Sequence, residues 1–413
     1  MNIFSVTKPQ LSTIDVPIET APEIELILCC ARTRLEPATK ERIEFLLRQN
    51  INWTYFIQIA TEHGVIPLIY QSLKATEPKA VPEKTFSELR FHSQGNELRN
   101  YYLFEKLIKI LDLLKAEGIS AVPFKGPLLS ITAYNKLSLR QFSDLDILVK
   151  KDDFLKAKNI LLQLDFKPID KLKMLNSQEE QAYLQEIDEF TLVRAKESIE
   201  VVCDLHQAIT VSHFRKCKIE FFKIKDKLTY ISFQGNKINT IKPDYLLILL
   251  CIHASRHFWC QLNWICDVNE LINSCEEINW LEILNEATSL GCRHHLLLGL
   301  ALSNSYFETT IAKEIQTIMQ KSLRVKYLSR YIQKAIFDPS ETKPNQGFNL
   351  SNFVYQMLLT NSWRGYKEII NYFIFPSRKD KLIFDLPSQF NFLYYFLRPV
   401  RLFSQLIARK NHN

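Results

Sequence analysis

Two aspartates, Asp144 and Asp146, stand at the start of the segment Asp144-Leu145-Asp146-Ile147-Leu148-Val149. The apolar run predicts a buried strand, on which residues two apart point to the same face. We therefore expect the two carboxylates to project together, with Cα atoms about 7 Å apart. Two adjacent buried like charges are costly unless a cation lies between them. Mg²⁺ suits this position because it takes oxygen ligands and leaves room for substrate phosphates, so the pair predicts an enzyme that handles a nucleotide.

A third carboxylate, Asp204, ends another apolar run, Ile199-Glu200-Val201-Val202-Cys203-Asp204. Phosphoryl and nucleotidyl transfer can use two metal ions about 4 Å apart that are held by shared carboxylates. Asp144 and Asp146 can bridge such a pair, and Asp204 is our candidate for the carboxylate that completes the site from a neighbouring strand. His206 lies two residues further on, is expected on the same face as Asp204 and is a candidate to line the cleft.

A candidate phosphate-binding turn, Lys125-Gly126, follows a short apolar run and precedes a helical pattern. Glycine lets the backbone approach a phosphate, and a helix N-terminus offers N–H groups without intrahelical partners. Lys125 is a candidate to pair with a phosphate oxygen, and an ordinary turn is the alternative. Arg140, four residues before Asp144, either binds phosphate as well or braces the acidic pair.

His253 and His257 are four residues apart and are expected on one helical face. No third metal ligand with suitable spacing follows them, so we expect histidines that line the cleft rather than a metal site. Trp259, Trp264 and Asp267 are expected to pack this helical region against the α/β centre, with Asp267 as a helix-anchoring acid.

These segments resemble the uncharacterised nucleotidyltransferase family, which belongs to the polymerase-β-like nucleotidyltransferase superfamily. The resemblance spans roughly residues 60–275. It rests on the segments 63–70 (HGVIPLIY), 122–127 (VPFKGP), 139–140 (LR), 143–149 (SDLDILV) and 204–206 (DLH), together with Tyr134, His253, His257, Trp259, Leu262, Trp264 and Asp267. A weaker likeness occurs at 397–402 (LRPVRL).

The resemblance implies transfer of a nucleoside monophosphate from an NTP to an acceptor, with release of pyrophosphate. It implies two Mg²⁺ ions, or Mn²⁺ in their place, held by Asp144, Asp146 and Asp204. The chain departs from the superfamily pattern where Lys125-Gly126-Pro127 stands in place of Gly-Ser or Gly-Gly, which predicts a different phosphate cradle. It departs from the family pattern at Gln207, where a tryptophan is usual.

The elements that would position these residues follow the order helices, α/β centre, helices. A helix is predicted from about 85 to 116, and strands at 119–124, 144–149, 166–169, 190–194 and 198–204. We predict an α+β fold in which a small mixed β-sheet nucleotidyltransferase core is flanked by N-terminal helices and a C-terminal helical domain. The expected divisions are a lead-in at 1–22, a helical region at 23–97, the core at 98–240 and a helical domain at 241–413.

The 413 residues are 46% hydrophobic and 23% charged, typical of a globular protein. The net charge of +7 permits an anionic substrate but does not indicate a nucleic-acid groove. Nine cysteines without a CxxC pair argue against a zinc ribbon. No signal peptide and no apolar run of about 20 residues is present, so we expect a soluble, cytoplasmic protein without a transmembrane segment.

Two other functions stay open from sequence. Nucleotide-sugar glycosyltransferases also use Asp-x-Asp with a metal, although their apolar strand usually precedes the acidic pair. A nucleotidyltransferase-like binding or scaffold protein without catalysis is the other alternative. The acceptor is also open: a small molecule, a peptide, a sugar, a protein side chain and an RNA end all fit. The basic, aromatic segment 392–410 can lie on an anionic membrane or pack on the helical domain.

Overall fold

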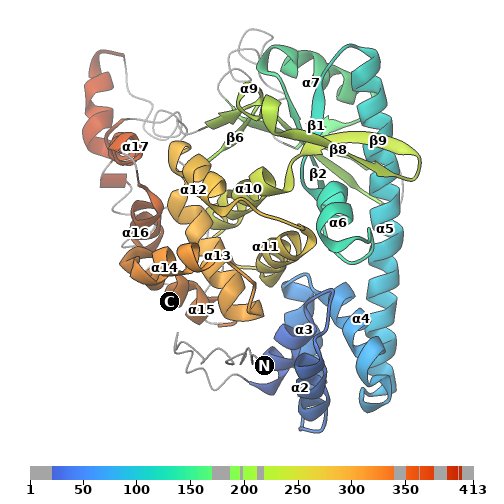
Figure 1. The fold of residues 1–413 in the computed structure, drawn as a ribbon. Coiled ribbons are helices and arrows are strands. Elements are labelled where there is room, and N and C mark those ends of the chain that lie inside the picture. The colour runs from blue at the N-terminus through green and yellow to red at the C-terminus, as the bar shows by residue number, and fades with distance from the viewer. Residues whose placement is uncertain are drawn as a thin grey trace, which may run out of the picture.

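A computed structural model describes residues 21–169, 187–195, 199–211, 218–338, 350–361, 363–375, 388–398 and 400–401. Residues 1–20 of the expected lead-in and the segment 402–410 of the basic C-terminus lie outside these residues, and Pro22, the last residue of the expected lead-in, begins the first described helix. The predicted α+β architecture is confirmed: a mixed sheet lies between helices from both ends of the chain (Figure 1). None of the described helices has both the length and the apolar character that crossing a membrane requires. The described cysteines form no disulfide.

The described helices and strands alternate only in the middle of the chain. The N-terminal helices are α1 (Pro22–Cys30), α2 (Pro37–Leu47), α3 (Trp53–Glu62), α4 (Ile66–Thr76) and α5 (Glu83–Ala116). The centre holds β1 (Ala121–Pro123), α6 (Gly126–Tyr134), β2 (Asp144–Val149), α7 (Phe154–Gln163), β3 (Lys167–Pro168), β4 (Glu189–Arg194), β5 (Val201–His206), β6 (Ala208–Thr210), β7 (Lys218–Glu220), α9 (Phe221–Ile224), β8 (Leu228–Phe233) and β9 (Asn236–Ile241). The C-terminal helices are α10 (Pro243–Arg256), α11 (Leu262–Ser274), α12 (Trp280–Ser289), α13 (Arg293–Phe307), α14 (Lys313–Lys321), α15 (Leu323–Ala335), α16 (Leu350–Leu359) and α17 (Trp363–Ile374).

The central sheet has the strand order β1-β2-β5-β4-β3. β2 and β5 run parallel, and the other neighbours are antiparallel. β5 extends to His206, two residues beyond the strand end expected from sequence. β5, which neighbours β2, therefore carries both Asp204 and His206.

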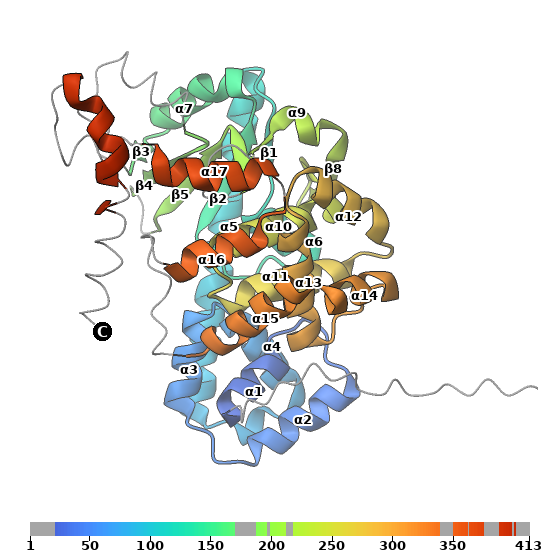
Figure 2. The same cartoon turned by 90° about the vertical axis from the view of Figure 1, so that its left-hand side faces the viewer.

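The two faces of β2 have different surroundings. Leu145, Ile147 and Val149 are fully buried in a cluster that includes apolar residues of α5 and α7. The alternate residues Asp144 and Asp146 project from the opposite face. On that side lies a larger apolar cluster, which unites the N-terminal helices with α10, α11 and α13. The sheet is therefore covered by helices on both faces (Figure 2). By strand alternation, the aspartates face the side that carries the C-terminal helices.

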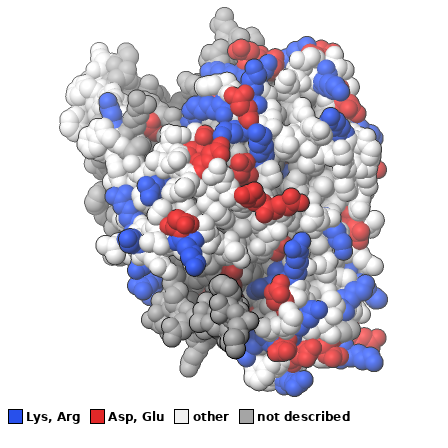
Figure 3. Space-filling model, viewed as in Figure 1, with Lys and Arg blue, Asp and Glu red and all other residues white. Residues whose placement is uncertain are grey.

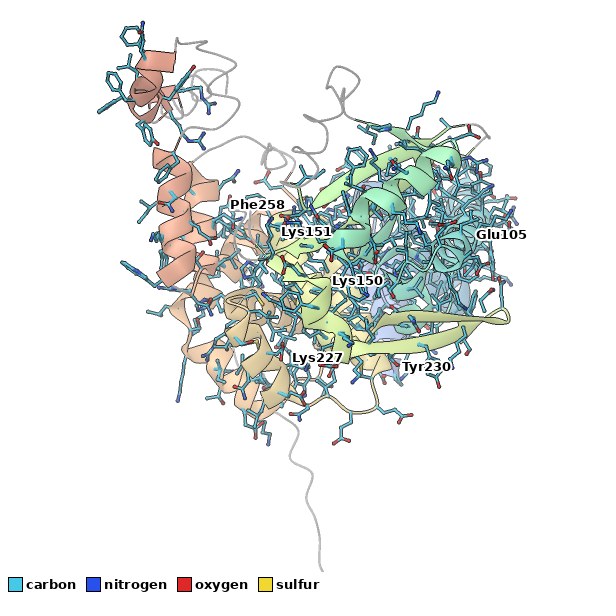
Figure 4. The ribbon with its side chains drawn as sticks, turned by 90° about the horizontal axis from the view of Figure 1, so that it is seen from above. Glu105, Lys150, Lys151, Lys227, Tyr230 and Phe258 are labelled. Atoms are coloured by element: carbon cyan, nitrogen blue, oxygen red, sulfur yellow. The ribbon has the colours of Figure 1, made fainter. Side chains whose placement is uncertain are left out.

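The hairpin β8–β9 is not predicted from the sequence. It turns at Gln234-Gly235, both with positive φ (47° and 75°), and crosses to β1, where the Thr240 hydroxyl donates to the Pro123 carbonyl. Its strands alternate in exposure and carry many polar residues, so their apolar pattern is weak. Figure 4 shows this hairpin with Tyr230 on it, and Lys150 and Lys151, which directly follow β2, apart from Tyr230 in the same view.

The charged side chains on the face drawn in Figure 3 alternate in sign. Lysines and arginines gather near the top of the view, but acidic residues lie between them. Elsewhere in the described residues, opposite charges also pair: Lys227 lies 3.6 Å from Glu282 and 3.6 Å from Glu286. The described residues on the face in Figure 3 therefore present no continuous basic surface of the kind that binds a nucleic-acid backbone.

Candidate active site

The strand register brings the three aspartates of the sequence analysis to one face of the sheet. Asp146 on β2 lies directly opposite Asp204 on the parallel strand β5, and Asp144 lies opposite Val202. Side chains of directly paired residues point to the same face, because neighbouring strands share their pleat. The carboxylates thus come from adjacent strands, as the sequence predicts.

Asp146 is buried and already paired. Its Oδ1 atom accepts from Lys125 Nζ at 2.7 Å and lies 3.1 Å from His206 Nε2. Its Oδ2 atom is buried without a hydrogen-bond partner among the described residues. Burial works to raise the pKa of this carboxyl, but Lys125 and His206 outweigh it and hold the pKa of Asp146 well below its usual range. Asp146 is therefore a carboxylate with one unused oxygen.

Lys125 is positioned by an unusual backbone turn. It ends the segment after β1, and Gly126 begins α6 with a φ of +50°, a left-handed conformation that favours glycine. A Cβ at Gly126 would lie 2.9 Å from the backbone carbonyl of Asp144, so any side chain there would clash. Burial works to lower the pKa of Lys125, but Asp146 and Asp144 raise it, so the ammonium stays charged.

The other two aspartates are less completely paired. Burial and then the neighbouring Asp146 raise the pKa of Asp144, although Lys125 and Arg140 oppose the shift. Burial raises the pKa of Asp204 to about 6, against a hydrogen bond from Thr191. Asp204 Oδ1 is buried without a partner among the described residues. Both carboxylates would be stabilised by an added cation.

A cavity of about 310 Å³ opens over Asp144 and Asp146. One wall is the sheet with the loop before β2, and the opposite wall is the end of α10 and the start of α11. The lining residues are Thr61, Gly64, Arg99, Lys125, Arg140, Gln141, Phe142, Ser143, Asp144, Asp146, His253, His257, Gln261, Asn263 and Trp264. Asp204 and His206 are not among these lining residues, although the strand register brings both to the same face of the sheet as Asp144 and Asp146.

His253 on α10 and His257, which directly follows that helix, both line the cavity, as expected from their spacing. His253 Nδ1 lies 3.3 Å from Lys125 Nζ, and the rings of His253, His257 and Trp264 lie with centroids 4.8–5.7 Å apart. Burial, then the Lys125 ammonium and His257, lower the pKa of His253 well below its usual value. Because an ammonium only donates, a neutral His253 must accept at Nδ1.

Arg140 pairs with Asp267 rather than with the acidic pair. Its Nε and one terminal nitrogen donate to the two Asp267 oxygens at 2.7 and 2.9 Å, and the Tyr134 hydroxyl donates to the same carboxylate at 2.7 Å. Asp267 is thus an anchoring acid, as predicted, and it ties α11 to α6 and to the loop before β2. One Arg140 nitrogen is buried without a partner among the described residues.

Arg99 on α5 lines the cavity and is not found by the sequence analysis. It donates to the carbonyls of Phe142 (2.6 Å) and Ser143 (3.4 Å), next to Asp144. Asn96 and Asn100 donate to the same loop, both of them to the Arg140 carbonyl. The spacing of these three residues on one helical face is the sequence signal that would have indicated a polar stripe.

The His63-Gly64 segment of the resemblance has a structural position at the cavity edge. His63 Nδ1 accepts from the Leu262 N–H at 3.1 Å, and its carbonyl accepts from the Asn263 N–H at 3.2 Å. Gly64 has a φ of +66°, and a Cβ there would lie 2.9 Å from the Asn263 side chain. The segment therefore docks the N-terminal helices onto the start of α11.

The described residues that line the cavity supply two carboxylates, which is only part of the ligand set that a hard divalent cation requires. Within the described ranges, no three His, Cys, Asp or Glu side chains converge as a preformed metal site. Asp144 and Asp146 nevertheless present carboxylate oxygens to one cavity, and Asp146 Oδ2 is unused. Mg²⁺ is commonly held by one or two carboxylates together with substrate phosphates, which this pair can provide.

Comparison with known proteins agrees with this geometry. No curated protein matches the chain significantly. A family model described as "uncharacterised nucleotidyltransferase" matches residues 49–308, which cover β1 to β9, the cavity and the helices α10 and α11. The match spans more than half of the sequence and contains the three aspartates. The chain therefore belongs to the uncharacterised nucleotidyltransferase family.

Proposed function

We propose that the protein transfers a nucleoside monophosphate from an NTP to an acceptor and releases pyrophosphate. One observation carries this proposal: two carboxylates, Asp144 and Asp146, face a cavity that is also lined by the cationic side chains of Lys125, Arg99 and Arg140. Carboxylates beside cations suit a substrate that arrives as a metal–polyphosphate complex.

In this proposal Asp144 and Asp146 would hold Mg²⁺ or Mn²⁺, which would neutralise charge on the phosphates and orient them. Arg99 and Lys125 would bind phosphate oxygens, supported by the N-terminus of α6. The helix wall with His253 and Trp264 would limit water at the reacting phosphate.

The transfer step forms a bond from the acceptor oxygen to the α-phosphorus and breaks the bond from that phosphorus to the pyrophosphate oxygen. The acceptor hydroxyl must lose a proton to a base. Asp204 is our candidate for that role, acting with the metal-holding pair, because a pKa of about 6 lets its carboxylate accept a proton near neutral pH. Because Asp204 is not among the residues that line the cavity, the proton would pass to it through a neighbouring group.

The test is calorimetric binding of non-hydrolysable ATP and GTP analogues, with and without Mg²⁺. We expect magnesium-dependent binding by the wild type and a loss of at least about 100-fold, or about 2.7 kcal/mol, in Asp144→Asn/Asp146→Asn. Glu25→Gln, which alters an exposed ion pair with Arg42, is the matched control and should bind like the wild type.

Equal binding by the folded double variant would refute the assignment of the two aspartates. A wild type that is folded yet binds neither analogue would refute the proposal itself. Nucleotide sugars would then be the next ligands, and their binding would support the glycosyltransferase alternative. Binding of no nucleotide of either class would support the scaffold alternative.

A further inference from the structure

The Lys125 ammonium lies beside Asp146, at the position where the proposed function expects a metal cation. It lies 2.7 Å from Asp146 Oδ1 in a position where both side chains are almost fully buried, with 11% and 3% of their surfaces exposed. His206 shares that oxygen from the other side. The negative charge of Asp146 is therefore compensated within the protein before any metal or nucleotide arrives.

Lys125 also has a second neighbour on the cavity side. Its Nζ atom lies 3.3 Å from Nδ1 of His253, which lines the cavity. An ammonium is a point charge on a flexible four-carbon stem, so it can change partners without a fixed bonding geometry. The ammonium is thus placed between the carboxylate and the space in which a polyphosphate would lie.

Arg140 lines the same cavity but, in contrast to Lys125, is held in a fixed geometry by its acidic partner. It makes two parallel bonds to Asp267, whose oxygens are both occupied. Asp146 instead keeps Oδ2 unused, and Lys125 contributes one bond to one oxygen. The Lys125–Asp146 pair can therefore be rearranged at lower cost than the Arg140–Asp267 pair.

We infer that Lys125 is an exchangeable counter-ion, which neutralises Asp146 in the free protein and moves to a nucleotide phosphate when a metal–nucleotide complex binds. This inference rests on the proposed function. A metal ion alone would have to share Asp146 with the ammonium, whereas a metal–nucleotide complex supplies both a cation for Asp146 and a new anion for Lys125. The site should therefore take up metal and nucleotide together, and each should strengthen binding of the other by the same factor.

The experiment measures Mn²⁺ binding directly, by electron paramagnetic resonance of the unbound ion, with and without a non-hydrolysable ATP analogue. For the wild type we expect at least a tenfold tighter affinity for Mn²⁺ when the analogue is present. In Lys125→Met, which keeps the side-chain length without the charge, we expect Mn²⁺ alone to bind about tenfold tighter than to the wild type. The same variant should bind the Mn²⁺–analogue complex about tenfold more weakly.

Two further variants serve as controls. Lys125→Arg keeps the positive charge, so it should bind Mn²⁺ alone as weakly as the wild type. Arg42→Met removes an exposed cation that pairs with Glu25, so it should leave the affinities for Mn²⁺ alone and for the complex unchanged. Should Lys125→Met not fold, Lys125→Gln serves the same comparison, and the affinity gain in the wild type tests the coupling by itself.

The outcomes separate the inference from the proposed function. If a folded Lys125→Met binds Mn²⁺ alone no tighter than the wild type, the counter-ion exchange is wrong even when the complex binds at Asp144 and Asp146. If the wild type binds Mn²⁺ equally with and without the analogue, the coupling is also wrong. If the wild type binds neither Mn²⁺ nor the complex, the proposed function fails as well.

Discussion

Two buried ion pairs contribute a cation to the same cavity, but they differ in how completely their charges are used. In the Arg140–Asp267 pair, both carboxylate oxygens accept from arginine, and Tyr134 adds a third bond. In the Lys125–Asp146 pair, one oxygen takes both Lys125 and His206, and the other has no partner among the described residues. Both pairs are buried and charged, but only Asp267 has hydrogen bonds to both of its carboxylate oxygens among the described residues.

The difference shows which pair supports the fold and which pair has bonding capacity left for a ligand. Asp267 ties together α11, α6 and the loop before β2, and residues of α11 and of that loop line the cavity. The Asp146 pair leaves a buried acceptor without a hydrogen bond, which costs stability unless a ligand uses it. Changes at the Arg140–Asp267 pair should therefore mainly lower the free energy of unfolding. Changes at the Lys125–Asp146 pair should mainly alter ligand binding.

The largest expected effect on stability comes from Asp267→Ala. Removing this carboxylate leaves the buried Arg140 guanidinium and the Tyr134 hydroxyl without their partner. Breaking a buried pair in this way costs about 3–5 kcal/mol in the free energy of unfolding. The measurement is chemical denaturation at equilibrium.

The control for this prediction removes both charges. Arg140→Met/Asp267→Leu should recover most of the lost stability, because neither charge is left buried alone. A single Asp267→Ala variant that loses less than about 1 kcal/mol would show that the pair is not the brace of the cavity wall.

Gly126→Ala tests the turn that connects the two pairs, because Gly126 follows Lys125 and starts the helix that ends at Tyr134. An alanine there must adopt a φ of +50° and place its Cβ 2.9 Å from the Asp144 carbonyl. We expect a loss of about 2–3 kcal/mol in unfolding free energy and weaker nucleotide binding, because Asp144 must shift.

The matched control is Gly95→Ala in α5. A Cβ at Gly95 meets no atom within 4 Å, and the position is helical. Alanine should therefore raise stability by up to about 1 kcal/mol through its higher helix propensity. If both glycine variants behave alike, the clash at Gly126 has no energetic consequence.

The sequence predicted the features that depend on local patterns. The run after Asp144 identifies β2, and an apolar run before Asp204 identifies β5. Strand periodicity then gives the shared face of Asp144 and Asp146, whereas the pairing of β5 with β2, which brings Asp204 opposite Asp146, is a tertiary contact. The partners of these residues depend on tertiary contacts and could not be predicted in this way. Arg140 is equally able to bind phosphate or an acid, and only the approach of α11 shows that Asp267 takes it. Arg99 lies 45 residues before Asp144 and reaches the site because α5 passes the loop.

A third buried group extends the comparison to a side chain without an acidic partner. His295 on α13 is 3% exposed, and its Nδ1 atom has no hydrogen-bond partner among the described residues. Burial, with a further contribution from His294, lowers the pKa of His295 to about 3. A buried cation thus persists where a carboxylate pairs with it, as in Arg140, whereas His295 stays neutral.

His295 should consequently make the folded state less stable in acid. Between its folded pKa of about 3 and the unfolded value near 6.5, the unfolded chain binds the proton and the folded chain does not. Above about pH 6.5 both states are neutral at His295, and the free energy of unfolding is unaffected by it. As the pH falls from 6.5 toward 3, the proton bound only by the unfolded chain lowers the free energy of unfolding progressively. Lowering the pH from 7 to 5.5 should cost the wild type about 1 kcal/mol more than His295→Leu, which carries no titrating group, by denaturation at the two pH values. An equal loss in both proteins would mean that His295 takes up a proton in the folded state, and that burial without an acidic partner does not keep a side chain neutral here.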